Sequence, residues 1–180
     1  IVLSNLQKEH AVDFLVRSAN ENPGEITLIC LAPLTNIADA IEKDPTFPSK
    51  IKSLISLGGT IKAHGNTHFF CQEFNYFLNC EAASKVFTNF KGNLIMIPFE
   101  AAIDFDKLPQ AELYKPFEHK ETEKGKLIYE AFSKAKTFSS TYMVCDQLAV
   151  AVAFHPKVVT EHHRRECLIE TEGKYTKGMV

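Results

Sequence analysis

The placement of apolar residues constrains the fold of this 180-residue chain more than any other feature. Three short runs are almost wholly apolar: ITLICLA at 26–32, SLISLGG at 53–59 and LIMIP at 94–98. Amphipathic segments separate them, namely LTNIADAIEK (34–43) and EAASKVFTNF (81–90). Continuous apolar runs are typical of strands buried on both faces, and their alternation with helices is typical of parallel sheets. The sequence therefore predicts an α/β fold with a mostly parallel sheet flanked by helices and a Rossmann-like core.

Further elements are predicted on either side of these runs. Residues 8–21 carry apolar side chains at helical spacing and end before Asn22-Pro23-Gly24, which predicts a first helix. The second half of the chain predicts polar helices near 107–115 and 121–137, a helix from Asp146 to just before Pro156, and a late strand at 166–173. No internal repeat interrupts this order, so we expect residues 1–180 to form a single domain.

The composition and charge of the chain exclude some classes of binding partner. The chain is 45% hydrophobic and 23% charged, which suits a globular domain with a substantial core. Its net charge of -2 does not favour phosphate backbones, so nucleic acid is not an expected partner. The longest helical apolar run, LAVAVAF at 148–154, is too short to cross a bilayer, so a membrane is not an expected partner either.

The five cysteines stand at scattered positions, without a CxxC pair or a nearby histidine: Cys30, Cys71, Cys80, Cys145 and Cys167. This spacing argues against a structural zinc site. An odd number of unpaired cysteines favours free thiols and a reducing compartment such as the cytoplasm.

The stretch GNTHFFCQEFNYFLNCEAA (65–83) carries the densest polar cluster. Asn66, Glu73 and Asn75 surround Phe74 immediately before a helical segment. A few amides and a carboxylate in an apolar setting are what a pocket for a hydroxyl-rich ligand requires. The alternative is a surface loop with a helix cap.

The expected topology brings other residues to this cluster. Parallel sheets bind ligands beyond the carboxyl ends of their strands. Leu31 lies at the end of the first predicted strand, residues 65–75 follow the second, and Asp146 begins a later helix. We therefore expect these positions to share one hollow, although Asp146 alone is equally explained as a helix N-cap.

Taken together, these segments resemble the inosine-uridine preferring nucleoside hydrolase family. The resemblance extends over nearly the whole chain, and its specificity comes from the order and spacing of the matching pieces: HAVDFL (10–15), LAPLTNIADAI (31–41), ISLGG (55–59), GN with EFN (65–66, 73–75), EAA (81–83), CDQLAVAVAFHP (145–156) and IETEGKYTKGM (169–179).

The resemblance implies a calcium-dependent enzyme that hydrolyses the N-glycosidic bond of purine or pyrimidine ribonucleosides to ribose and a free base. In such an enzyme calcium holds the attacking water, and the transition state resembles a ribosyl oxocarbenium ion. An aspartate cluster near the N-terminus supplies the base and most metal ligands. The implied partner is a small ribonucleoside, and the full-length protein is expected to be a homo-oligomer.

The resemblance also implies roles for individual residues. Asn66 and Glu73 would hold the ribose 5′-hydroxyl, and Phe74 would pack on the sugar. Asn75 would contact the 2′-hydroxyl side and stabilise the developing positive charge.

Two further positions are implied as metal ligands. Asp146 would bind calcium and accept a hydrogen bond from the 3′-hydroxyl, and Leu31 would offer its backbone carbonyl. Calcium prefers such oxygen ligands, and a metal-bound water loses its proton readily.

The main departure from the family pattern is the aspartate cluster DxDxxxDD, which does not occur in this sequence. Asp146 and Leu31 supply two oxygens, whereas calcium takes about six to eight. We therefore expect the chain to be the central and C-terminal part of a longer hydrolase domain and to be inactive alone. A non-catalytic nucleoside- or sugar-binding paralogue and a purely structural α/β domain remain the alternatives.

Three smaller departures concern the site. The interval from Asn66 to Glu73 is one residue longer than the family pattern, which predicts either a bulged loop or a shift of the 5′-hydroxyl contact from Asn66 to another residue. Cys145 stands where family members acting on inosine and uridine carry a histidine, and it is either a weak acid or an inert thiol. Asn79-Cys80 replaces Asp-Pro before Glu81, with Asn as an equivalent helix cap.

Overall fold

The computed structural model describes residues 6–103, 121–135 and 144–180 of the chain. The chain divides into two compact units, residues 1–100 with 145–180, and residues 101–144. The described part of the second unit contains helix α8 (Glu123–Ala135), which corresponds to the helix predicted at 121–137. The helix predicted at 107–115 lies outside the described residues.

A parallel sheet forms the centre of the first unit, with its strands in the order β1-β2-β3: β1 (Thr27–Cys30), β2 (Ser53–Leu57) and β3 (Leu94–Ile97). This confirms the α/β class and all three predicted strands. Four of the five residues of β2 are buried, as expected for a strand with a neighbour on each side. β1 and β3 are only partly buried, because each pairs on one side only within the described sheet, so the prediction that these two strands are buried is wrong.

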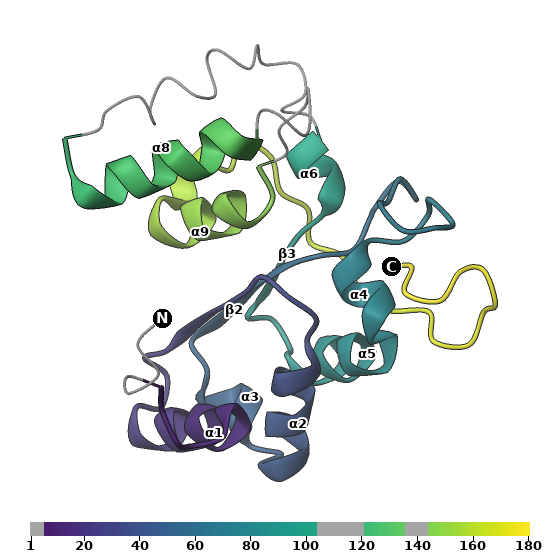
Figure 1. Cartoon of the computed structure of the whole chain (residues 1–180). Coiled ribbons are helices and arrows are strands. Elements are labelled where there is room, and N and C mark those ends of the chain that lie inside the picture. Colours follow the sequence, from purple (N-terminus) through teal and green to yellow (C-terminus); the bar gives the residue numbers. More distant parts are fainter. Residues whose placement is uncertain (1–5, 104–120, 136–143) are drawn as a thin grey trace. The chain divides into compact units, whose positions relative to one another are not determined.

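Helices cover both sides of this sheet (Figure 1): α1 (Ala11–Glu21), α2 (Thr35–Lys43), α3 (Phe47–Lys50), α4 (Phe74–Leu78), α5 (Cys80–Asn89) and α9 (Asp146–Phe154). α2 packs between α1 and α5 on one side, and α9 packs on β1 and β2 on the other. The two short elements, α3 and α4, were not predicted. Two further helical turns are α6 (Phe99–Ile103) and the 3-10 turn η4 (Pro156–Val158).

The prediction of a late strand at 166–173 is wrong, because this segment folds as a loop. The Glu170 carboxylate accepts hydrogen bonds from the backbone N–H groups of Glu172 and Gly173, at 2.8 and 3.1 Å. Gly178 N–H donates a hydrogen bond to Glu170 C=O at 2.7 Å, which closes the loop. A polar side chain that captures nearby backbone donors offers the chain a turn in place of a strand.

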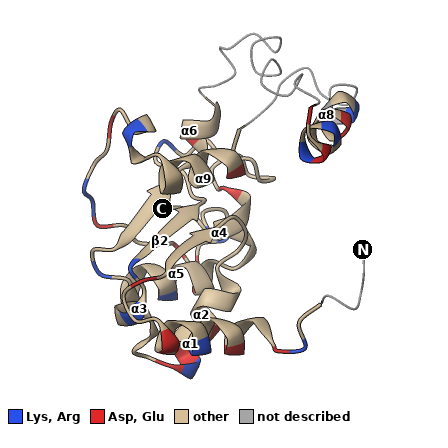
Figure 2. Ribbon diagram, turned by 90° about the vertical axis from the view of Figure 1, so that its left-hand side faces the viewer, with Lys and Arg blue, Asp and Glu red and all other residues tan. Residues whose placement is uncertain are grey.

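The core lies between the sheet and helices α1, α2 and α5. Tyr76 is fully buried there, and its hydroxyl donates a hydrogen bond to Ser56 Oγ at 2.9 Å. Figure 2 shows acidic and basic residues interspersed along the ribbon of α1, and the exposed Arg17 pairs there with Glu9 and Glu21. Such exposed ion pairs contribute about 0–1 kcal/mol each, so burial of the apolar core carries the stability of this unit. Within the described residues, no helix has the length and apolarity needed to cross a membrane.

The close approach of β2 to α4 yields a first prediction. Gly58 has φ of +154°, and a Cβ atom there would overlap the ring of Tyr76. We expect Gly58→Ala to lower the free energy of unfolding by about 2–4 kcal/mol, through overpacking and backbone strain together, measured by urea denaturation.

Gly92→Ala is the matched control. Gly92 also has a positive φ, +93°, but a Cβ atom there would meet nothing within 4 Å. The free energy of unfolding of Gly92→Ala should fall only by the cost of backbone strain, about 1–2 kcal/mol. Equal losses in the two variants would contradict the steric argument.

Candidate functional site

A cavity of about 300 Å³ lies at the carboxyl ends of the strands. Its walls come from each strand end, from the start of α4 and from the start of α9: Leu31, Leu57, Gly58, Asn66, Glu73, Phe74, Asn75, Phe99, Cys145 and Asp146. All six residues named as site candidates from the sequence are in this set. The geometric expectation that separate segments share one hollow is therefore confirmed, while the chemical roles remain predictions.

Glu73 is the most constrained polar group of the cavity. It is 5% exposed and is the N-cap residue of α4. One carboxylate oxygen accepts from Asn75 N–H at 2.9 Å, and the other accepts from Tyr76 N–H at 3.3 Å and Gly59 N–H at 3.0 Å. The helix-cap alternative is thus confirmed for Glu73. The same side chain lines the cavity and ties the end of β2 to the start of α4.

The charge of Glu73 is set by opposing effects. Burial raises the pKa of its carboxyl group above the ordinary value, and the three backbone N–H donors act in the opposite direction. The nearby carboxylate of Asp146 is a further, smaller cause of the raised pKa. Two carboxylates therefore line one small cavity.

The side chain of Asn75 connects two strand ends. Its Nδ2 atom donates to Leu57 C=O at 3.2 Å and is 3.5 Å from Leu31 C=O. Asn75 is buried, so this placement satisfies polar atoms that solvent reaches poorly. The carboxamide is consequently held at the floor of the cavity by β1 and β2.

Asn66 reaches the same place from the loop that precedes α4. Its Oδ1 atom accepts from Phe74 N–H at 2.8 Å, while its own backbone N–H donates to Gln72 C=O at 3.1 Å. Phe74 is 50% exposed and lines the cavity. The additional residue between Asn66 and Glu73 fits in a compact turn in which Phe70 adopts a positive φ of 62° and accepts from Gly65 N–H.

Cys145 and Asp146 close the cavity from α9. Asp146 is the first residue of α9 and Cys145 is its N-cap residue, so the alternative of Asp146 as the N-cap is wrong. Burial is the main cause that raises the pKa of the Cys145 thiol to about 11, with the negative charges of Asp146 and Glu73 adding to it. The thiol therefore stays protonated at neutral pH and is a poor proton donor.

Three of the wall residues were not named from the sequence: Leu57, Gly58 and Phe99. They follow from the rule that parallel strands present ligand sites at their carboxyl ends, applied to β2 and β3 as well as β1. His68, in the loop before α4, is not among the wall residues, and its ring packs edge-on against Phe69 at 5.2 Å between ring centroids.

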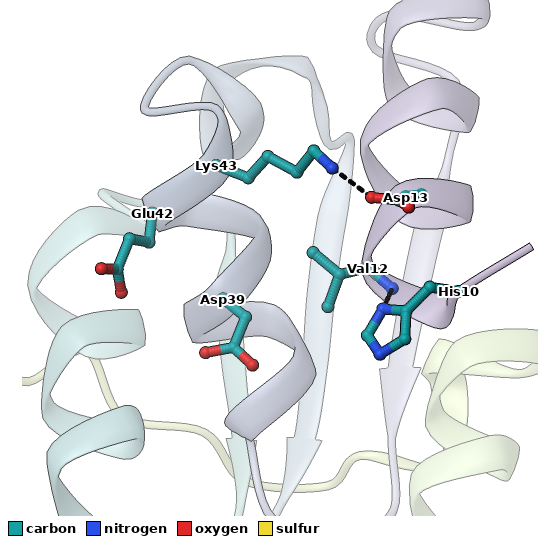
Figure 3. A pocket seen from close by; sticks show the side chains of 6 residues that line it. All are labelled: His10, Val12, Asp13, Asp39, Glu42 and Lys43. Carbon is teal, nitrogen blue, oxygen red and sulfur yellow. Dashed lines mark hydrogen bonds and ion pairs between the residues drawn. The ribbon is translucent and has the colours of Figure 1, made fainter.

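A second, more open hollow of about 490 Å³ lies between α1 and α2 (Figure 3): its wall residues are His10, Val12, Asp13, Asp39, Glu42 and Lys43. Lys43 extends across it to form an ion pair with Asp13, and His10 accepts a hydrogen bond from Val12 N–H. Lys43, the one Lys or Arg side chain among these wall residues, is thus already paired with a neighbouring carboxylate. None of the residues predicted as site candidates lies there, so the cavity at the strand ends is the candidate site.

The family model described as "Inosine-uridine preferring nucleoside hydrolase" matches residues 3–180. The chain belongs to this family. This confirms the resemblance seen in the sequence, and the fold and the strand-end cavity agree with it.

Relatives of known name support the assignment. A probable uridine nucleosidase 1 of Oryza sativa subsp. japonica is 43% identical over 81 residues, covering 45% of this chain and 25% of that protein. The pyrimidine-specific ribonucleoside hydrolase RihB of Escherichia coli O1:K1 / APEC is 37% identical over 84 residues, covering 46% and 26%. The solved plant nucleoside hydrolase PpNRh1 superposes with a TM-score of 0.81 at 26% identity, covering 99% of this chain and 57% of that chain.

The chain thus spans about a quarter of the curated relatives it matches and 57% of that solved relative.

The environment of Glu73 yields a second prediction. Because burial favours its neutral form, its carboxyl group should take up a proton at a higher pH than an ordinary glutamate, whose pKa is about 4.3, measured by ¹³C NMR titration of the Glu73 side chain. A group whose folded-state pKa is raised adds stability below its unfolded pKa of about 4.3, and this stability is lost as the pH rises through the folded pKa. A Glu73 midpoint at or below about 4.3 would contradict this account of the site.

Proposed function

We propose that the protein containing this chain hydrolyses the N-glycosidic bond of ribonucleosides, releasing ribose and the free base. The observation that carries the proposal is the convergence of Glu73, Asn75 and Asp146 on one cavity at the strand ends of a nucleoside hydrolase fold. The names of the relatives, a uridine nucleosidase and a ribonucleoside hydrolase, support the same reaction.

The size and lining of the cavity suit a pentose. A volume of about 300 Å³ is at the small end of ligand pockets, and apolar residues such as Leu57 and Phe99 form part of its wall. Asn66 and Glu73 are proposed to hold the 5′-hydroxyl, with Phe74 packed on the sugar. Glu73 Oε1 accepts only one of the three backbone donors, so it retains acceptor capacity for a hydroxyl.

Electrostatics of the site suit a transition state with positive charge on the sugar. Glu73, Asp146 and Leu31 line the cavity, where Glu73 is buried and Asp146 is exposed. Oriented oxygen dipoles and carboxylates stabilise an oxocarbenium-like ion more strongly there than in water. Asn75 is proposed to contact the 2′-hydroxyl side, and Asp146 is proposed to accept from the 3′-hydroxyl.

Calcium is the cofactor that the family resemblance implies. The described residues offer Asp146 and the Leu31 carbonyl as ligands, whereas calcium takes about six to eight oxygens. Within the described part of the chain, no group of three or more His, Cys, Asp or Glu side chains could hold a metal ion. These residues therefore do not form a calcium site by themselves, and none of the residue roles above depends on one.

The same proposal makes this chain the central and C-terminal part of a longer hydrolase domain. The 57% coverage of the solved plant relative supports it. A full-length gene product that carries the aspartate pattern DxDxxxDD would support hydrolysis. A full-length gene product without those aspartates would favour a non-catalytic binding paralogue.

Asp146→Ala tests the proposed sugar contact. In the full-length gene product, we expect this change to abolish release of base from inosine and uridine, measured by chromatography of the products, because the 3′-hydroxyl would lose its proposed acceptor. Asp39→Ala, in the hollow between α1 and α2, is the control and should leave the rate unchanged. Near-normal activity of Asp146→Ala would remove Asp146 from the site.

Asn75→Ala tests the proposed contact with the developing charge. A contact that strengthens at the transition state affects turnover more than substrate affinity. We therefore expect kcat to fall about 100-fold or more, with a smaller change in KM, in steady-state assays with uridine. Asn89→Ala, on the exposed end of α5, is the control. A change confined to KM would contradict the role proposed for Asn75.

A further inference from the structure

A second buried carboxylate, Glu100, lies beside the cavity without lining it. Glu100 follows β3 at the start of α6 and is 8% exposed. Its Oε1 atom accepts from Lys62 N–H at 2.7 Å and from Ile61 N–H at 3.0 Å, and its Oε2 atom is 3.2 Å from Ile61 N. One carboxylate therefore satisfies two consecutive backbone donors from a segment about 40 residues away in sequence.

These two donors begin the site loop, residues 60–73, which runs from the end of β2 to the start of α4. The two limbs of the site loop are joined to each other. Thr60 Oγ1 donates to Cys71 C=O at 3.2 Å, and Asn66 N–H donates to Gln72 C=O at 3.1 Å. Gly65 lies so close to the backbone of Gln72 that a Cβ atom would overlap it. A shift at the start of the loop would therefore be transmitted to Asn66.

The two ends of the site loop are thus each held by a buried carboxylate. Glu73 joins the end that enters α4 to Gly59, just after β2, and Glu100 holds the first residues of the loop, Ile61 and Lys62. Consecutive backbone N–H groups form a concave site for an anion, and a buried carboxylate without such donors would be costly. The Glu100 carboxylate and the N–H groups of Ile61 and Lys62 therefore stabilise each other. This contact favours one position of the loop relative to the end of β3.

We propose that Glu100 is a positioning residue that fixes Asn66 at the cavity by holding the start of the site loop. The proposal rests on the proposed function, because Asn66 is there the contact to the ribose 5′-hydroxyl. Glu100 acts through the backbone of Ile61 and Lys62, and its effect on a substrate should appear only where that substrate has a 5′-hydroxyl.

The first test is amide hydrogen exchange, which needs no activity. Glu100→Gln removes the charge and turns one acceptor into a donor that faces a backbone N–H. We expect the amides of Ile61, Lys62 and Phe74 to exchange about tenfold or more faster, since Phe74 N–H is held by Asn66 Oδ1. Glu42→Gln, which alters an exposed pair with Lys85, is the control and should leave these three amides unchanged. Unchanged exchange at Phe74 in Glu100→Gln would overturn the proposal.

The second test uses the substrate itself. In the full-length gene product, Glu100→Gln should raise KM for uridine about tenfold and leave KM for 5′-deoxyuridine within about twofold of wild type. If Glu100 had a merely structural role, KM would rise alike for uridine and for 5′-deoxyuridine. That result would overturn the proposal. If no variant, wild type included, hydrolyses either nucleoside, the proposed function fails, and exchange at Phe74 still decides the role of Glu100.

Two measurements cover the case in which Glu100→Gln does not fold. Glu100→Asp keeps the negative charge but has a shorter side chain. The same three amides should exchange faster than in wild type, by a smaller factor than in Glu100→Gln. In the wild-type chain, the amides of Ile61 and Lys62 should exchange more slowly than that of Ala63. Equal exchange at these three positions would show that Glu100 does not hold the loop.

Discussion

The structure around the cavity depends on one interaction, the capture of three buried backbone N–H groups by the carboxylate of Glu73. Gly59 belongs to the end of β2, and Asn75 and Tyr76 belong to the first turn of α4, so one side chain sets how the strand and the helix meet. A buried carboxylate is unfavourable unless such donors surround it, and unpaired helix N–H groups are unfavourable unless they find an acceptor. The geometry of this junction places Asn75 over the ends of β1 and β2.

The fold could be predicted from the sequence where the apolar pattern was long and unambiguous. The three strands and helices α1, α2, α5 and α9 each have a clear period or a continuous apolar run. The short α4 could not be found in this way, because its five residues are too few to show a helical period. The apparent alternation at 166–173 was misleading, because the Glu170 side chain captures backbone donors and turns the chain.

The sequence predicted which polar residues line the site, but only some of the contacts among them. Strand-end topology brings Leu31, Asn66 and Asp146 to one cavity, as expected from the sequence. The sequence did not reveal that Glu73 both caps a helix and faces the cavity, because capping and ligand contact use the same residue types. It also did not reveal Glu100, whose partners are backbone N–H groups that any residues at 61 and 62 would supply.

The central claim is that a pentose binds at the strand ends of this family member, between α4 and α9. The most direct measurement is a crystal structure of the full-length gene product with a non-hydrolysable ribonucleoside analogue. The account predicts sugar hydroxyls within hydrogen-bonding distance of the side chains of Asn66, Asn75 and Asp146. A sugar bound elsewhere, for example in the hollow between α1 and α2, or one that leaves these three side chains without a contact, would contradict it.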